Sequence, residues 1–172
     1  MNQENKIVDG FRFMPPGLKA YIGQNIPKEP FSGRIPWTPM KKPCRETKFS
    51  LMTSAGISMK KDPPFDMERE KREPTWGDPT HREIPREATE LDIDVNHLHV
   101  RTDPVKEDMN VTLPVRRFAE FEEEGIIGKL APTCYSFYGF QLNPRILLEE
   151  TMPKVLSRMK EEGVEAALLT PF

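Results

Sequence analysis

The placement of proline constrains this chain more than any other feature of its sequence. Eighteen of the 172 residues are proline, and seven of them fall within the first 47 residues. Proline fixes φ and has no N–H donor, so this segment cannot form a long helix or a central strand. We therefore expect residues 1–47 to form an extended, proline-rich arm. The aromatic residues of the arm indicate that it packs on an apolar surface, either of its own domain or of a partner.

Composition excludes several classes of protein. The 25 basic residues nearly balance the 27 acidic ones, whereas a nucleic-acid-binding protein needs an excess of positive charge, so we expect no nucleic-acid partner. The sequence contains no apolar run of about 18 residues, and its first ten residues do not resemble a secretory signal. Its two cysteines, Cys44 and Cys134, form neither a disulfide framework nor a CxxC metal site. We therefore expect a cytoplasmic protein without a membrane span.

Residues 48–172 show the alternation of strands and helices that is typical of an α/β domain. We expect helices after Thr112 and after Thr151, each of which would end at a glycine, and strands over residues 49–56, 91–100 and 164–172. The last strand is almost continuously apolar, as buried parallel strands are, and a helix leading into such a strand is half of a βαβ unit. The sequence predicts an open, mostly parallel sheet with flanking helices, in a flavodoxin- or Rossmann-like three-layer arrangement.

Candidate site residues follow from where strands end. Ligands of open α/β sheets bind at the carboxyl ends of the strands, and residues 60–85 are expected to form a long polar loop, of the kind that is usually functional or mobile. The candidate substrate-binding residues are Ser54, Gly56, Asp62, His81, Arg82, His97 and His99. We interpret Cys134 as a packed, unreactive thiol because no histidine or second cysteine lies near it in the sequence.

The pair His97 and His99 permits three interpretations. Two histidines two residues apart on a strand share one face, and they bind zinc when a third ligand such as His81 comes close. They also suit a carboxylate substrate, or they are solvated polar residues. Because no second group of ligands stands at a diagnostic spacing, we expect no metal site.

The strand at residues 164–172 is expected to need a further element or a partner that covers it. It is the last element of the chain, and an α/β domain normally places a further loop and helix after such a strand. Exposed leucine and valine side chains forgo roughly 1.5–3 kcal/mol each, and an open strand edge promotes aggregation. We therefore expect the fold to be incomplete at its C-terminus, so that either a partner or further sequence covers this strand.

Several short motifs, taken in order, resemble a known family. The chain is similar over residues 35–172 to the selenoprotein B family of glycine, sarcosine, betaine and D-proline reductases, and most similar to its shorter, proline-reductase-like members. The motifs are Ile35-Pro36-Trp37-Thr38-Pro39, the strand to Gly56, Asp62-Pro63-Pro64-Phe65-Asp66, Arg82-Glu83-Ile84-Pro85, Gly128-Lys129-Leu130-Ala131-Pro132, and Leu147-Leu148-Glu149-Glu150-Thr151 through Leu168-Leu169-Thr170-Pro171.

The resemblance implies reductive cleavage of a C–N bond in an amino-acid-like substrate during amino-acid fermentation. A dithiol or thioredoxin would supply the electrons, and a partner subunit would carry a pyruvoyl group that holds the substrate amine, so the resemblance implies a hetero-oligomer. In that family a selenocysteine directly follows the strand that corresponds to residues 164–172, and a cysteine stands three residues after it. Neither Cys44 nor Cys134 falls at those positions, so no catalytic residue is expected within these residues.

A hypothesis about the gene follows from the same resemblance. Selenocysteine is encoded by UGA, which is ordinarily read as a stop, and the sequence ends at Phe172 where that codon would fall. The chain is therefore expected to be the front part of a longer selenoprotein. Two alternatives stay open: a non-catalytic binding or assembly subunit of such a complex, and a metal-dependent hydrolase that uses His97 and His99.

Overall fold

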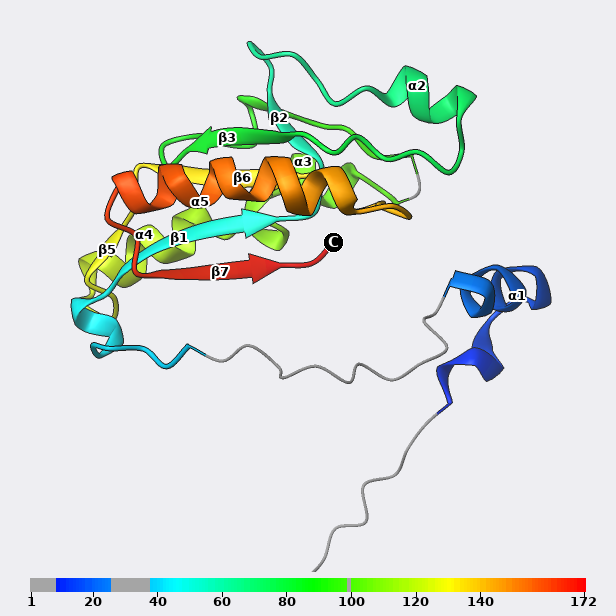
Figure 1. The fold of residues 1–172 in the computed structure, drawn as a ribbon. Helices are drawn as coiled ribbons and strands as arrows, with labels where there is room; N and C mark the ends of the chain where they lie inside the picture. The colour runs from blue at the N-terminus through cyan, green and yellow to red at the C-terminus, as the bar shows by residue number, and fades with distance from the viewer. Residues whose placement is uncertain (1–8, 26–37, 99) are drawn as a thin grey trace, which may run out of the picture. The chain divides into compact units, whose positions relative to one another are not determined.

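The computed structural model describes residues 9–25, 38–98 and 100–172 (Figure 1). It divides into two units, Met1–Thr38 and Pro39–Phe172, and each is described by itself. The division comes earlier than the predicted boundary after residue 47. Residues just after Pro39 belong with the sheet, since Lys42 is paired to Glu165 at 2.6 Å and Thr47 is buried. The motif residues Ile35, Pro36 and Trp37 lie outside the described residues.

The described part of the first unit is helical rather than extended. A 3₁₀ turn, η1 (Gly10–Phe13), follows Asp9, whose carboxylate accepts a hydrogen bond from the N–H of Phe11 at 3.0 Å, and helix α1 spans Pro16–Asn25. The prediction of an extended arm is wrong over these residues. No proline interrupts the segment between Pro16 and Pro27, and a proline in the first turn costs nothing because its missing N–H would have no intrahelical partner.

The second unit is built on a five-stranded sheet. Its centre is β1 (Lys48–Thr53), which pairs in parallel along one edge with β7 (Ala166–Thr170). The other edge of β1 pairs in parallel first with β5 (Lys129–Leu130) and then with β6 (Thr133–Phe137). Strand β3 (His81–Pro85) pairs antiparallel with β6. The sheet is therefore mostly parallel, as predicted.

Helices cover both faces of this sheet (Figure 1). Helix α4 (Val115–Glu123) lies on one face, and the π-helical turn η4 (Leu147–Thr151) leads into α5 (Met152–Glu161) on the other. Neighbouring residues of β1 serve the two layers: Leu51 belongs to the core on the α4 side, and Met52 packs with the α5 side. This alternation follows from the two-residue period of a strand, and the three-layer prediction is confirmed.

Smaller elements complete the unit. A separate two-stranded antiparallel sheet pairs β2 with β4, and the remaining elements are short helical segments. These elements are η2 (Cys44–Glu46), β2 (Ile57–Met59), α2 (Met67–Arg72), β4 (Ile93–Val95), α3 (Asp103–Glu107) and η3 (Met109–Val111). Gly125 and Gly163 both have φ of 70°, which confirms that they terminate the helices before them.

Three local predictions need correction. Residues 81–85 form edge strand β3 rather than loop, because antiparallel pairing with β6 satisfies their backbone. Among the described residues of the strand predicted over 91–100, only Ile93–Val95 form a strand, because the pairing with β2 ends at Val95. Thr112 does not cap a helix: α4 starts after Pro114, and the Thr112 hydroxyl lies 2.8 Å from that of Thr53.

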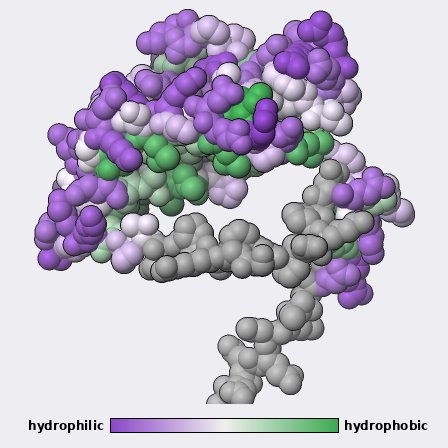
Figure 2. Space-filling view, viewed as in Figure 1, coloured by the Kyte–Doolittle hydropathy of each residue, from purple (hydrophilic) through white to green (hydrophobic). Residues whose placement is uncertain are grey.

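Strand β7 is an exposed edge strand rather than a buried one. Leu168 is 37% exposed and Leu169 is 67% exposed, because within the described residues β7 pairs with β1 alone. Figure 2 shows apolar surface between α5 and this edge of the sheet. Two consecutive leucines of a strand point to opposite faces, so β7 presents apolar side chains on both.

Candidate functional site at the carboxyl edge of the sheet

The turn after β1 joins three strand ends at the carboxyl edge of the sheet. The N–H of Ser54 donates to the carbonyl of Thr170 at 3.2 Å, and the carbonyl of Ser54 accepts from the N–H of Gly139 at 3.0 Å. The Ser54 hydroxyl accepts a hydrogen bond from the N–H of Phe172 at 3.0 Å. Ser54 therefore stands where the sequence predicted a rim residue, and it fixes the backbone beyond β7.

Gly56 holds the next turn in a conformation that favours glycine. Its φ is 65°, and a Cβ at this position would lie 2.5 Å from the carbonyl oxygen of Asn96. The Gly56 carbonyl accepts hydrogen bonds from the backbone N–H of Asn96 at 2.9 Å and from its side-chain Nδ2 at 3.0 Å. This close approach anchors the loop that carries His97.

Threonine hydroxyls bind the strand ends to the loop before α4. The buried hydroxyls of Thr53 and Thr112 are 2.8 Å apart. The Thr170 hydroxyl lies 2.5 Å from the carbonyl oxygen of Thr112 and 3.1 Å from that of Met52. These contacts hold β1, β7 and the segment before α4 together just beneath the edge.

His97 lies within an aromatic group at this edge. Its ring centroid is 4.9 Å from that of Tyr138 and 6.3 Å from that of Phe172. The Tyr138 hydroxyl donates a 2.7 Å hydrogen bond to Oε1 of Glu70, whose side chain is buried. Burial raises the pKa of Tyr138, and the Glu70 carboxylate acts in the same direction. The half-buried His97 ring therefore packs against the tyrosine whose hydroxyl is bonded to the buried Glu70 side chain.

Glu70 and Tyr138 were missed at the sequence level. Glu70 is one of several charged residues in Met67–Arg72, a helix too short for its period to reveal which residue turns inward. Tyr138 belongs to an aromatic run after β6, which signals packing but not a hydrogen bond.

Arg82 has a structural role in the loop before α2. Its guanidinium donates to the carbonyls of Pro63 at 2.7 Å and Pro64 at 2.8 Å, and it stacks 4.2 Å above the ring of Phe65. These contacts occupy the flat face and the donors that would recognise a carboxylate substrate. The role of Arg82 in substrate binding stays a prediction, and in this structure its guanidinium is engaged within the chain.

The other predicted residues do not join the group at the edge. His81 neighbours Arg82 on β3 and points to the opposite face, where it lies 6.3 Å from the ring of Tyr135 and burial lowers its pKa. Asp62 lines a shallow pocket with Thr133, the first residue of β6, and therefore lies near the start of that strand. His99 lies outside the described residues. The structure thus brings together Ser54, Gly56 and His97.

D-proline reductase subunit gamma of Acetoanaerobium sticklandii is 34% identical to the chain over 134 residues, which is 78% of this chain and 52% of the relative. The chain is similar to a D-proline reductase subunit. This similarity supports a relation to the proline reductase family, and the chain spans about half the length of that relative. No family model and no solved structure matches the chain.

The cysteines of this chain, which resembles a D-proline reductase subunit, lie apart from the edge. Cys44 is exposed and belongs to η2, which precedes β1 and so stands at the amino end of the sheet. Cys134 is buried near the start of β6, and burial raises its pKa to about 12. A thiol with so high a pKa is almost fully protonated at neutral pH, which agrees with the expected packed and unreactive thiol.

The described ranges of the chain, 9–25, 38–98 and 100–172, show neither a cluster of metal ligands nor a membrane-spanning helix. Within them no group of three or more histidine, cysteine, aspartate or glutamate side chains is arranged to hold a metal ion. Within the same ranges, no helix combines the length and the apolar character needed to cross a bilayer.

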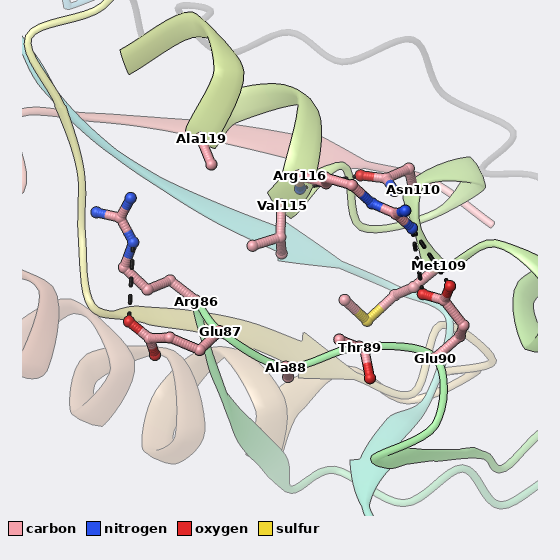
Figure 3. A pocket seen from close by; sticks show the side chains of 10 residues that line it. All are labelled: Arg86, Glu87, Ala88, Thr89, Glu90, Met109, Asn110, Val115, Arg116 and Ala119. Atoms are coloured by element: carbon pink, nitrogen blue, oxygen red, sulfur yellow. Dashed lines mark hydrogen bonds and ion pairs between the residues drawn. The ribbon is translucent and has the colours of Figure 1, made fainter. Parts of the chain in front are cut away.

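A pocket of about 260 Å³ lies between the β3–β4 connection and α4 (Figure 3). Its charged side chains are already paired. Arg86 lies 2.9 Å from a carboxylate oxygen of Glu122, and Arg116 lies 3.3 Å from Glu90. Because these pairs satisfy both cations, the pocket offers little to an anionic ligand, and we assign it no substrate.

Proposed function

We propose that this chain is part of a selenoprotein B-type subunit of a reductase complex that cleaves the C–N bond of D-proline. The observation that carries the proposal is the 34% identity to D-proline reductase subunit gamma over 78% of the chain. The name of that relative favours D-proline over glycine, sarcosine or betaine as the substrate. The carboxyl edge with Ser54 and His97 is then the side that faces the substrate, as in other open α/β sheets.

The proposed reaction balances with a dithiol as the reductant. The bond between the α-carbon and the nitrogen of D-proline breaks, and two electrons and two protons convert the ring into 5-aminopentanoate while the dithiol becomes a disulfide. The nucleophile must be a selenolate or thiolate, and buried Cys134 is unsuited to that role because of its raised pKa.

We place the reactive selenocysteine after Phe172 and the pyruvoyl group on a partner subunit. The Ser54 hydroxyl holds the N–H of Phe172, and the Phe172 ring lies against His97, so a residue that followed Phe172 would emerge at the same edge. Such a selenol supplies the nucleophile when it is present. Reading the codon after that of Phe172 tests this placement: UGA followed by an open frame supports it, and UAA or UAG contradicts it.

The assay of function uses the full reading frame, co-expressed with the neighbouring reductase genes. Purified complex is given D-proline and dithiothreitol, and 5-aminopentanoate is measured by mass spectrometry. We expect turnover with D-proline and much less with glycine, sarcosine or betaine. A complex that consumes one of the other three and leaves D-proline intact overturns the choice of substrate, and a complex inactive on all four overturns the reductase assignment.

The exposed strand β7 favours a second candidate, a non-catalytic assembly subunit. Leu169 on this strand is 67% exposed, and Phe172 after it is 36% exposed. Under this alternative, Leu169→Asp would prevent co-elution with the partner subunits in size-exclusion chromatography, and the partners would reduce D-proline without this chain. Loss of turnover when the chain is omitted favours the catalytic role instead.

A further inference from the structure

Three segments far apart in the sequence place a buried acid behind the histidine of the edge. Glu70 comes from α2, Tyr138 follows β6, and His97 follows β4. The 2.7 Å hydrogen bond from Tyr138 to Glu70 and the 4.9 Å contact of the Tyr138 and His97 rings connect them. The connection leads from a carboxylate that is 2% exposed to a half-buried imidazole beside Phe172.

The burial of Glu70 is unusual within its own helix. Glu68 pairs with Lys71 at 2.6 Å and Arg69 pairs with Glu73 at 3.2 Å, all at the surface, whereas Glu70 turns inward. Removing a carboxylate from water costs several kcal/mol unless partners compensate for the lost hydration. An apolar side chain of similar size would avoid this cost, so the carboxylate at position 70 calls for a reason other than stability.

The loop that carries His97 is held on both sides of that residue. Before it, Asn96 bonds to Gly56 and also donates to the Ser58 hydroxyl at 2.8 Å. After it, the backbone N–H of Leu98 faces the phenol oxygen of Tyr138 and acts to lower the pKa of that phenol. The Tyr138 hydroxyl thus joins the Glu70 carboxylate to the His97 loop, while its ring packs on the imidazole.

We propose that His97 donates a proton to the leaving nitrogen at the carboxyl edge, and that Tyr138 and Glu70 are positioning residues that hold it there. This inference rests on the proposed function. As the C–N bond breaks, the nitrogen takes the electron pair of that bond, and the imidazolium of His97 transfers its proton to that nitrogen. The dithiol supplies the two electrons that the α-carbon gains. Solvent supplies the second proton, which completes the new C–H bond at that carbon, and solvent also reprotonates the imidazole.

Histidine suits this step because an imidazole nitrogen can carry a proton and release it to a neighbouring atom. Proton transfer to a leaving group by a positioned side chain contributes about 10²–10⁴-fold to the rate of a reaction. A general acid contributes this much only when it is held at the right position relative to the reacting atom. That requirement explains why the buried Tyr138–Glu70 hydrogen bond, which is costly to form, would be kept to hold the His97 imidazole.

The first test removes the imidazole of His97 by substitution and then supplies free imidazole in solution. In the full-length complex, we expect His97→Ala to lower kcat for D-proline by about 10²–10⁴-fold with little change in KM. Added imidazole should restore part of the lost kcat, with saturation as its concentration rises. A variant with normal kcat overturns the role of His97, and a variant that loses activity without any rescue by imidazole shows a structural role.

The second test examines the positioning residues without using activity. NMR of the full chain, with the His97 signals assigned by comparison with His97→Gln, reports the ring-current shift that Tyr138 imposes on the imidazole. We expect Glu70→Gln and Tyr138→Phe to alter or broaden those signals, and Glu68→Gln, an exposed change on the same helix, to leave them intact.

These two readouts separate the inference from the proposed function. If the signals of His97 stay unchanged in both variants, the positioning role is wrong whatever the complex reduces. If they change while the wild-type complex fails to reduce D-proline, the proposed function is wrong and the contact stands. Tyr138→Phe removes one hydroxyl and Glu70→Gln keeps the side-chain shape, so either variant that folds is sufficient for the measurement.

Discussion

At the scale of single residues, the geometry of the carboxyl edge depends strongly on Gly56. The turn after β1 must bring the Asn96 loop against the sheet, and it does so by a backbone contact that leaves no room for a Cβ. Gly125 also has a positive φ, yet a Cβ there would meet nothing within 4 Å. Substituting alanine at both glycines therefore distinguishes the cost of the left-handed conformation, which both share, from the cost of a steric clash, which arises at Gly56 alone.

We expect Gly56→Ala to lower the free energy of unfolding by about 3 kcal/mol or more, and Gly125→Ala by about 1–2 kcal/mol. The left-handed conformation costs both variants roughly 1–2 kcal/mol, and the 2.5 Å approach of Asn96 O adds to the cost at Gly56 alone. Urea unfolding followed by circular dichroism measures both values. Equal losses in the two variants would mean that the Asn96 loop moves away at little cost.

The two cysteines should differ sharply in reactivity. Cys44 is exposed, whereas Cys134 is buried and its pKa is raised to about 12. Alkylation requires an accessible thiolate, so iodoacetamide at pH 8 should add one label to the native chain, at Cys44. In concentrated urea we expect two labels by mass spectrometry. Rapid labelling of Cys134 in the native chain would contradict its placement in the core.

At the scale of elements, one carboxylate joins α4 to the sheet. Glu122, near the end of α4, accepts a hydrogen bond from the N–H of Leu130 at 2.9 Å and pairs with Arg86 at 2.9 Å. Burial by itself would raise the pKa of Glu122, but these two contacts outweigh it and the pKa is lowered. The stabilisation is therefore present above the unfolded-state pKa, and it is lost as the pH falls through the lower folded-state value.

We expect Glu122→Gln to cost about 1–2 kcal/mol of unfolding free energy at pH 7, since it weakens a charge-assisted contact. The difference from wild type should shrink as the pH falls below 4.5, the ordinary pKa of a glutamate. Glu123→Gln, an exposed neighbour on the same helix, serves as the control and should change little. A difference that persists unchanged at pH 3 would exclude the ionised carboxylate as its cause.

Elements with strong local signals were predictable from the sequence. The apolar spacing in α5, its terminal Gly163 and the apolar run of β7 all follow local rules, and these elements are present. Strand β3 was missed because His81–Pro85 is charged and ends in proline, and it becomes a strand only through its partner β6. A strand that forms only through tertiary pairing cannot be recognised from the residues of one short segment.

The candidate site was predictable only in part, for the same physical reason. Ser54 and Gly56 follow a recognisable strand, so their place at the edge could be inferred. The side-chain direction of His81 and the engagement of Arg82 depend on which face of β3 each residue occupies. The burial of Glu70 depends on Tyr138, a residue 68 positions away. Contacts between distant segments require the folded structure.

At the scale of the whole molecule, the division between the two units can be tested by shortening the chain. The core clusters on both faces of the sheet consist of residues after Thr38. Residues 39–47 contribute Thr47, which is 3% exposed and whose hydroxyl donates to the carbonyl of Pro43 at 3.0 Å. They also contribute the carbonyl of Cys44, which accepts from Gly128 N–H at 2.9 Å, and the ion pair of Lys42 with Glu165 at 2.6 Å.

A chain that starts at Pro39 should therefore unfold in urea at nearly the same midpoint as the full chain. Its free energy of unfolding should differ from that of the full chain by no more than about 0.5 kcal/mol. A chain that starts at Lys48, where the sequence placed the boundary, loses the buried threonine and the hydrogen bonds around Cys44. We expect it to be about 2–3 kcal/mol less stable, because each buried group left without its partner costs about 1–3 kcal/mol. Equal midpoints for the two shortened chains would favour the boundary at residue 47. A large loss already in the chain from Pro39 would contradict the division of the chain at residue 38.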